Sequence, residues 1–179
     1  MENNDLYEKS ILLIGPSGMG KTTIGRELSK KTGMGQLCLD RIANEDRRLG
    51  VRGRFPSSDD YKLYLFKKII DNAKKDNSFG IVDFGAGHSV FESEEKFMEA
   101  QELLCNFQNI VLLKYSDDIE ESLRVINSRS TGDTNDNFRF LTSECNTRLA
   151  TITIYTKDKT VEEIAEEIIE ITKKKDNTK

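Results

Sequence analysis

One short stretch, IGPSGMGKTT over residues 14–23, combines three glycines with a lysine and two threonines. From Gly15 to Thr22 it fits the pattern G-x-x-x-x-G-K-[ST] without a mismatch. Glycines let successive backbone N–H groups point inward around a phosphate, and the helix that follows adds its positive dipole end. The pattern therefore predicts a triphosphate site, with ATP as the simplest ligand.

Two side chains of this loop are of the types that do chemistry. We expect Lys21 to reach the β- and γ-phosphates and Thr22 to place its hydroxyl on Mg²⁺. The predicted cofactors are therefore ATP and Mg²⁺. The other residues predicted to contact the nucleotide are Gly15, Pro16, Ser17, Gly18, Met19, Gly20 and Thr23.

A second group of reactive side chains lies in DFGAGHS, residues 83–89. Asp83 ends an apolar run, an arrangement in which a carboxylate holds Mg²⁺ through water; the alternative is a plain strand-end aspartate. His88, the one histidine of the chain, is with Ser89 a candidate contact of the acceptor substrate. A single histidine in a loop is also often incidental, so both interpretations stand.

Arginines are concentrated in the segment from residue 41 to residue 54. Arginine pairs with carboxylates and phosphates in a bidentate manner, so these side chains suit an anionic acceptor. The alternative is a solvated basic face, because Glu45 and Asp46 are interspersed. The five arginines are Arg41, Arg47, Arg48, Arg52 and Arg54.

The elements that must position these residues alternate along the chain. Short apolar runs predict buried strands at 11–14, 37–39, 80–84, 110–113 and 151–155. Helical spacing or composition predicts helices at 21–31, 60–74, 94–107 and 117–127, and a capping box of Thr160 and Glu163 opens a last helix. Such alternation predicts a parallel sheet with helices on both faces. We expect a mobile polar loop over 128–137 and a frayed tail over 173–179.

Length and charge limit the function classes. The chain has 179 residues, which favours a single domain, and its net charge of −4 disfavours a generic nucleic-acid binder. The sequence contains no apolar stretch long enough for a membrane span. Cys38, Cys105 and Cys145 are widely spaced, which predicts reduced thiols in a cytoplasmic protein. We expect a monomer.

The nucleotide loop alone does not decide the reaction, because kinases, ATPases and GTPases share it. The sequence has no guanine-reading N-K-x-D, and ATPase motors usually need a longer chain. A small kinase that phosphorylates a small polar acceptor fits the length best.

A family resemblance supports this prediction. The stretch GPSGMGKTTIGRELSKKTG, a following strand that leads to Asp40, and the end ATITIYTKDKTVEEIAEEII resemble the shikimate kinases. The triplet Gly85, Ala86 and Gly87 occupies the place of that family's glycine triplet after the third strand. The resemblance implies an α/β fold: a three-layer P-loop NTPase of the nucleoside-monophosphate-kinase type, with a five-stranded parallel sheet in order 2-3-1-4-5.

The resemblance also implies roles for individual residues. Asp40 stands where the family keeps the carboxylate that grips the acceptor hydroxyl. The alternative is that Asp40 is a helix N-cap or a solvated loop residue. Arg124 matches the arginine over the adenine. Arg129 falls near the catalytic arginine of the lid, with Arg139 as the alternative. We expect an acceptor-covering segment at about 41–60 and a lid at about 128–139 that closes to exclude water.

The sequence departs from the family on the acceptor side. Cys38 stands in place of a second, Mg²⁺-holding aspartate, and the arginines expected to clamp the shikimate carboxylate are missing; Tyr64, Lys67 and Lys68 lie near one of those positions. The first hypothesis is therefore an ATP-dependent kinase with a divergent, anionic acceptor. The alternatives are a nucleoside or nucleotide kinase and a non-catalytic ATP-binding regulatory protein.

Overall fold

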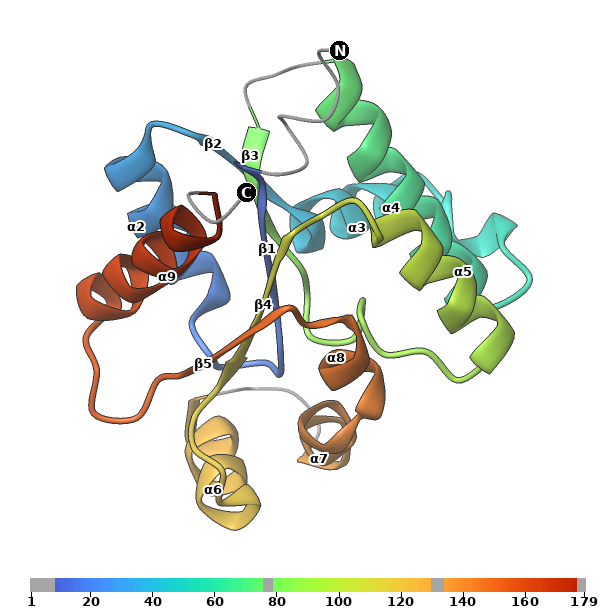
Figure 1. Ribbon diagram of the computed structural model, residues 1–179. Helices are drawn as coiled ribbons and strands as arrows, with labels where there is room; N and C mark the ends of the chain where they lie inside the picture. Colours follow the sequence, from blue (N-terminus) through green and yellow to red (C-terminus); the bar gives the residue numbers. More distant parts are fainter. Residues whose placement is uncertain (1–8, 76–78, 130–133, 177–179) are drawn as a thin grey trace.

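The computed structural model describes residues 9–75, 79–129 and 134–176. Within those residues, five parallel strands form one sheet in the order β2-β3-β1-β4-β5 (Figure 1). The predicted fold class and strand order are confirmed. The strands are β1 (Ile11–Ile14), β2 (Gly35–Cys38), β3 (Phe79–Asp83), β4 (Asn109–Lys114) and β5 (Ile152–Tyr155).

The central strand β1 is buried on both faces because all four of its residues are apolar. Leu12 and Ile14 pack into one hydrophobic cluster, and Ile11 and Leu13 pack into a second cluster on the opposite face. Alternate side chains of a strand point to opposite faces, so a continuous apolar run suits a strand that is covered on both sides.

Helices cover both faces of the sheet (Figure 1). On one face lie α2 (Lys21–Thr32) and α9 (Val161–Asp176), and on the other α3 (Leu39–Arg48), α4 (Ser58–Lys75) and α5 (Glu94–Leu104). The remaining described helical elements are η1 (Arg52–Arg54), α6 (Ile119–Arg129), α7 (Thr134–Thr142) and α8 (Glu144–Leu149). Within the three described ranges, no helix is both long and apolar enough to cross a bilayer.

The segment of residues 41–54 and the predicted loop over 128–137 are both mostly helical in their described parts. The arginine-rich stretch forms α3 and η1, and Leu39, predicted to end a strand, begins α3. The reason is tertiary: Asp46 of α3 is buried and accepts hydrogen bonds from the Tyr61 hydroxyl (3.2 Å) and the Lys68 ammonium (3.3 Å) of α4.

The prediction of a mobile loop over 128–137 is wrong for those residues of the range that the structure describes. Helix α6 continues to Arg129 and α7 begins at Thr134, while residues 130–133, the middle of the expected lid, lie outside the described residues. The buried Asn137 of α7 donates to the side chain of Asn127 at 2.8 Å, which ties the two helices together. The last three residues of the expected frayed tail are likewise outside the described ranges.

Candidate active site

The loop between β1 and α2 has the backbone that a phosphate site needs. Gly15, Gly18 and Gly20 have φ of 135°, 75° and 81°, which side-chain-bearing residues rarely adopt. A Cβ on Gly15 would lie 2.6 Å from the carbonyl oxygen of Leu113 in β4. Helix α2 is described in full and has neither a side-chain cap nor an acidic residue in its first turn. Its first N–H groups and its dipole are therefore open to an anion.

Lys21 lies across this loop. Its side chain is buried, and the ammonium donates hydrogen bonds to the carbonyl oxygens of Gly15 (2.8 Å) and Pro16 (2.7 Å). Burial lowers the pKa of Lys21, while the fields of Asp83, Asp40 and Cys38 oppose that shift. The loop thus holds a cation directly beside its uncapped N–H groups.

Thr22 and Asp83 meet although they are far apart in sequence. The Thr22 hydroxyl donates to the Asp83 carboxylate at 2.5 Å. Asp83 is 1% exposed and pairs in register with Leu13 of β1 on one side and Cys38 of β2 on the other. Burial raises the pKa of Asp83, partly offset by the hydrogen bond from Thr22 and by the Lys21 charge. A hydroxyl and a carboxylate at a phosphate loop fit the oxygen ligands that Mg²⁺ prefers.

Cys38 lies at the same place as a neighbour of the Asp83 carboxylate, with which its thiol shares a hydrogen bond. Burial raises the pKa of the Cys38 thiol; a backbone hydrogen bond from Arg41 opposes this shift and the field of Asp83 adds to it, so the thiol stays protonated. A neutral thiol is a poor ligand for Mg²⁺, because that ion prefers oxygen. In the part of the chain that the structure describes, Asp83 is thus the carboxylate that stands closest to Thr22.

The acceptor-side residues gather around the turn that follows β3. Asp40, in the first turn of α3, is exposed and its Oδ1 lies 3.9 Å from His88 Nδ1. The N–H of Gly85 donates to His88 Nδ1 at 3.1 Å. A Cβ on Gly85 would lie 2.0 Å from Asp40 Oδ1, so only glycine lets this carboxylate approach the backbone so closely.

The rest of the turn is structural. Gly87 lies under the ring of Phe140 in α7, which a Cβ would meet at 3.1 Å, and Ala86 is half-buried beside it. Ser89, grouped with His88 on sequence, is fully buried and donates to Asn146 at 2.6 Å. Of this pair only His88 remains a candidate acceptor contact.

The candidate lid arginines differ in their surroundings. Arg129, at the end of α6, lies beside the nucleotide loop, because a Cβ on Gly18 would lie 3.4 Å from the Cβ of Arg129. Its guanidinium lies 5.8 Å from the centre of the Tyr115 ring. Arg139 is paired with Glu92 at 2.9 Å, so the geometry favours Arg129. Arg124 is exposed on α6.

The arginine-rich segment is exposed at all five arginines. Arg52 lies over the ring of Tyr61 with its guanidinium carbon 5.7 Å from the ring centre. Burial, together with Asp46, raises the pKa of Tyr61 to about 12, so this phenol stays neutral and keeps its hydrogen bond to Asp46. Of the five arginines, Arg52 is thus positioned by an aromatic ring.

One buried ion pair was missed by the sequence analysis. Lys62 and Asp59 of α4 are both buried and lie 2.7 Å apart. Asp59 also accepts the N–H groups of Glu92 and Ser93 at 2.9 Å, and Lys62 donates to the carbonyl oxygen of Val90. The field of Lys62 acts on His88. The acid and lysine three residues apart were the only sequence signal, and such pairs usually lie on surfaces.

The three residues that stand near the missing family arginine in sequence, Tyr64, Lys67 and Lys68, are each paired with other side chains. Lys67 is exposed and paired with Glu99 at 2.9 Å, and Lys68 is paired with Asp46. Tyr64 packs against Phe55 in a tilted arrangement, at a ring-centre distance of 5.0 Å. Among the described side chains of α4, Lys62 is the cation whose charge acts on His88.

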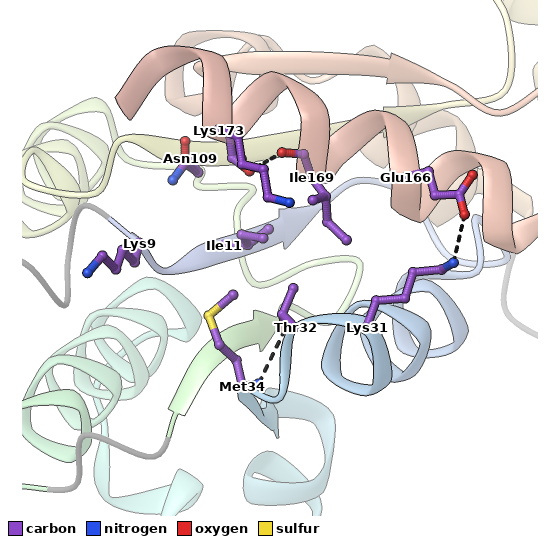
Figure 2. Close-up of a pocket in the computed structure, with 10 residues that line it drawn as sticks. Lys9, Ile11, Lys31, Thr32, Met34, Asn109, Glu166, Ile169 and Lys173 are labelled. Carbon is purple, nitrogen blue, oxygen red and sulfur yellow. Dashed lines mark hydrogen bonds and ion pairs between the residues drawn. The ribbon is translucent and has the colours of Figure 1, made fainter. Parts of the chain in front are cut away.

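A cavity of about 620 Å³ lies at the opposite edge of the sheet (Figure 2). It is lined by the start of β1, the end of α2 and the last turns of α9, with Ile11 and Ile169 among its apolar residues. Its Lys31 is paired with Glu166 at 2.8 Å, and its Thr32 donates to Leu28. Because α2 separates this cavity from Lys21, it is not part of the candidate phosphate site.

Solved proteins share this architecture. A solved shikimate kinase from Acinetobacter baumannii, in complex with shikimate, aligns over 96% of this chain and 98% of its own, with a TM-score of 0.68 and 17% identity. The fold is that of the shikimate kinases. A gluconokinase from Sinorhizobium meliloti 1021 aligns over 96% and 95% of the two chains, with a TM-score of 0.61 and 14% identity.

Sequence similarity is confined to part of the chain. A curated shikimate kinase from Oceanobacillus iheyensis is 42% identical over 71 residues, which is 40% of this chain and 35% of that protein. The match therefore spans about a third of the length of that relative. No protein-family model matches the chain. The comparisons thus support the shikimate kinase fold, and the acceptor has to be argued from the site.

Proposed function

We propose that this protein is an ATP-dependent kinase that transfers the γ-phosphoryl group to a hydroxyl of a small polar, anionic acceptor. The observation that carries the proposal is the convergence of Lys21, the Thr22–Asp83 pair and Asp40 at one edge of the sheet: the charges of Asp83 and Asp40 both act on Lys21. A cation, a metal-ligand pair and a carboxylate beside a phosphate loop are the parts that phosphoryl transfer needs.

Each residue has a role in the proposed transfer. The backbone of residues 15–20 and the Lys21 ammonium hold the β- and γ-phosphates. Thr22 and Asp83 would hold Mg²⁺, which, when bound, neutralises phosphate charge. Asp40 orients the acceptor hydroxyl and takes its proton as the oxygen bonds to the γ-phosphorus and the bond to the β-phosphate oxygen breaks, releasing ADP. Arg129 stabilises the charge that develops on the transferred group.

The acceptor side supports an anionic acceptor other than a nucleoside. Arg52 and Lys62 bring positive charge to the surroundings of His88. The aromatic side chains of this region contact each other, with ring centres of Phe55, Tyr61 and Tyr64 5.0–6.0 Å apart. These rings contact one another rather than standing apart as a pair that could clamp a base, which favours a non-nucleoside acceptor.

The proposal is tested by an ATP-consumption screen over hydroxylated acids and sugars, with shikimate and D-gluconate included. At least one acceptor should raise ADP formation above the basal rate, and Lys21→Ala should remove that increase. If the protein binds ATP tightly but no acceptor raises turnover, the kinase assignment fails and a regulatory ATP-binding role gains support.

A further inference from the structure

His88 has a defined hydrogen-bonding state. Its Nδ1 accepts the N–H of Gly85 at 3.1 Å, and its side chain is 15% exposed. A neutral imidazole has one donor and one acceptor nitrogen, so a ring whose Nδ1 accepts carries its proton on Nε2. The backbone of the turn after β3 thus selects the Nε2–H form of this ring.

The Nε2–H group is open to a ligand. Across residues 9–75, 79–129 and 134–176, no protein group bonds to His88 Nε2, and this atom is not among the fully buried side-chain atoms that lack a partner. A polar atom that is neither paired nor fully buried reaches accessible space. His88 therefore presents a donor at the wall that also carries Asp40.

The charges around the ring keep it neutral. Among the described residues, Asp40 of α3 favours the imidazolium, and Lys62 of α4, Lys21 of α2 and Arg52 of η1 oppose it. Burial is the largest influence, and it lowers the pKa of His88 to about 4. A neutral ring leaves the Asp40 carboxylate free of a cationic partner at 3.9 Å, so the carboxylate remains available to an acceptor hydroxyl.

We infer that His88 is a specificity residue of the proposed kinase, whose Nε2–H donates to an acceptor oxygen that neighbours the hydroxyl held by Asp40. The inference rests on the proposed function. The reacting oxygen needs its lone pair for phosphorus, so the donor serves a different oxygen of the same molecule. The acceptor class is accordingly a polyol or hydroxy acid with adjacent oxygens, and a mono-alcohol is excluded.

The first experiment needs no acceptor. The chain has one histidine, so ¹⁵N-labelled protein without a histidine tag gives one pair of imidazole nitrogen signals in a long-range ¹H–¹⁵N spectrum. Near neutral pH we expect a protonated Nε2 and an unprotonated Nδ1, with no titration near the ordinary value of 6.5. A proton on Nδ1, or a titration midpoint near 6.5, overturns the inference whatever the kinase assay gives.

The second experiment uses an acceptor found in the screen. His88→Gln retains a donor near the position of Nε2, whereas His88→Asn retains only an acceptor near Nδ1. We expect His88→Asn to raise the KM for the acceptor about tenfold, with kcat and the KM for ATP nearly unchanged, and His88→Gln to stay within about threefold of the wild type. The wild type should also prefer the acceptor to an analogue that lacks the neighbouring oxygen, and His88→Asn should lose that preference.

The outcomes separate the two proposals. A screen without any acceptor ends the proposed function, and the acceptor role of His88 with it. An acceptor whose KM is equal in the wild type and both variants overturns the His88 inference alone. Equal increases in the KM for ATP and for the acceptor indicate a distorted site and also overturn it.

Discussion

At the scale of single residues, the close approach of Asp40 to Gly85 is the tightest constraint on the proposed acceptor site. The Asp40 carboxylate occupies the space where a side chain at Gly85 would begin. A carboxylate that must meet a substrate hydroxyl within hydrogen-bonding distance tolerates little displacement. The absence of a Cβ at Gly85 therefore permits this position of the proposed base.

Gly85→Ala should lower kcat/KM for the acceptor by about 100-fold, because the new methyl displaces Asp40 by roughly an ångström or more. ATP affinity, measured by calorimetry, should not change. The control is a double-mutant cycle. In an Asp40→Ala background, Gly85→Ala should lower kcat/KM less than it does in the wild type, because the clashing carboxylate is gone and the remaining close contact of the new Cβ is with His88 Cε1 at 2.9 Å. Equal losses in both backgrounds would show that the glycine acts in some other way.

His88 should also make stability depend on pH. Between its folded pKa of about 4 and its ordinary value of 6.5, the folded ring binds fewer protons than the unfolded one, so stability rises with pH across this window and falls as pH drops through it. The contribution is about 3 kcal/mol. Denaturant unfolding at both ends of the window measures the free energy of unfolding of the wild type and of His88→Gln. The change in this free energy between the two pH values should be larger in the wild type by that amount, and equal changes in the two proteins would contradict the prediction.

At the scale of elements, the ends of the helices determine where ligands and stability reside. Helix α2 leaves its first turn uncapped at the nucleotide loop. Helix α9 is closed instead: Thr160 accepts the N–H of Glu163 at 3.2 Å, and Glu163 accepts the N–H of Thr160 at 2.8 Å, which confirms the predicted capping box. One helix start is available for an anion, and the other only stabilises the fold.

Thr160→Ala should therefore lower the free energy of unfolding by about 1 kcal/mol and leave nucleotide binding unchanged. Denaturant unfolding measures the first quantity and calorimetry with ATP the second. Glu162→Gln is the matched control, because Glu162 is exposed in the same turn and outside the capping box; it should change stability by less than about 0.5 kcal/mol. A loss of ATP affinity in Thr160→Ala would contradict this separation.

At the scale of the whole molecule, the strand order places the nucleotide loop between the turn after β3 and the end of β4. Because β1 lies between β3 and β4, Asp83 and Leu113 both lie beside residues of the loop. A ligand held here contacts parts of the chain that are distant in sequence. Its binding should therefore stabilise the fold as a unit.

With Mg²⁺ and ATP at 100 times its Kd, the protein should gain about 2.7 kcal/mol, which corresponds to a rise in Tm of about 5–10 °C for a chain of this size. Thermal unfolding with and without the nucleotide measures the shift. Lys21→Ala should abolish most of it at the same concentration. Lys31→Ala, at the far end of the same helix and paired with Glu166, should retain it.

The geometry of the nucleotide loop follows from the sequence, because the residues concerned are contiguous or end strands; their roles in binding stay predictions. Residues 15–22 form one local motif, and the position of Asp83 at the end of an apolar run sufficed to bring it near Thr22. The Lys62–Asp59 pair and the buried Asp46 were out of reach, because charged residues on helices are usually solvated and only the packing of α4 against α3 and the start of α5 buries them.

The order of the strands also bears on how the chain folds during synthesis. β1 is made first, yet its two neighbours begin only at Phe79 and Asn109. No hairpin can satisfy the edges of β1 early, since parallel strands pair only through crossovers. Until β4 has left the ribosome, the apolar residues 11–14 lack one partner strand. A nascent chain arrested before that point exposes an unpaired apolar strand edge that is prone to aggregation. The strand that supports the nucleotide loop is thus also the one that a chaperone has the longest time to bind.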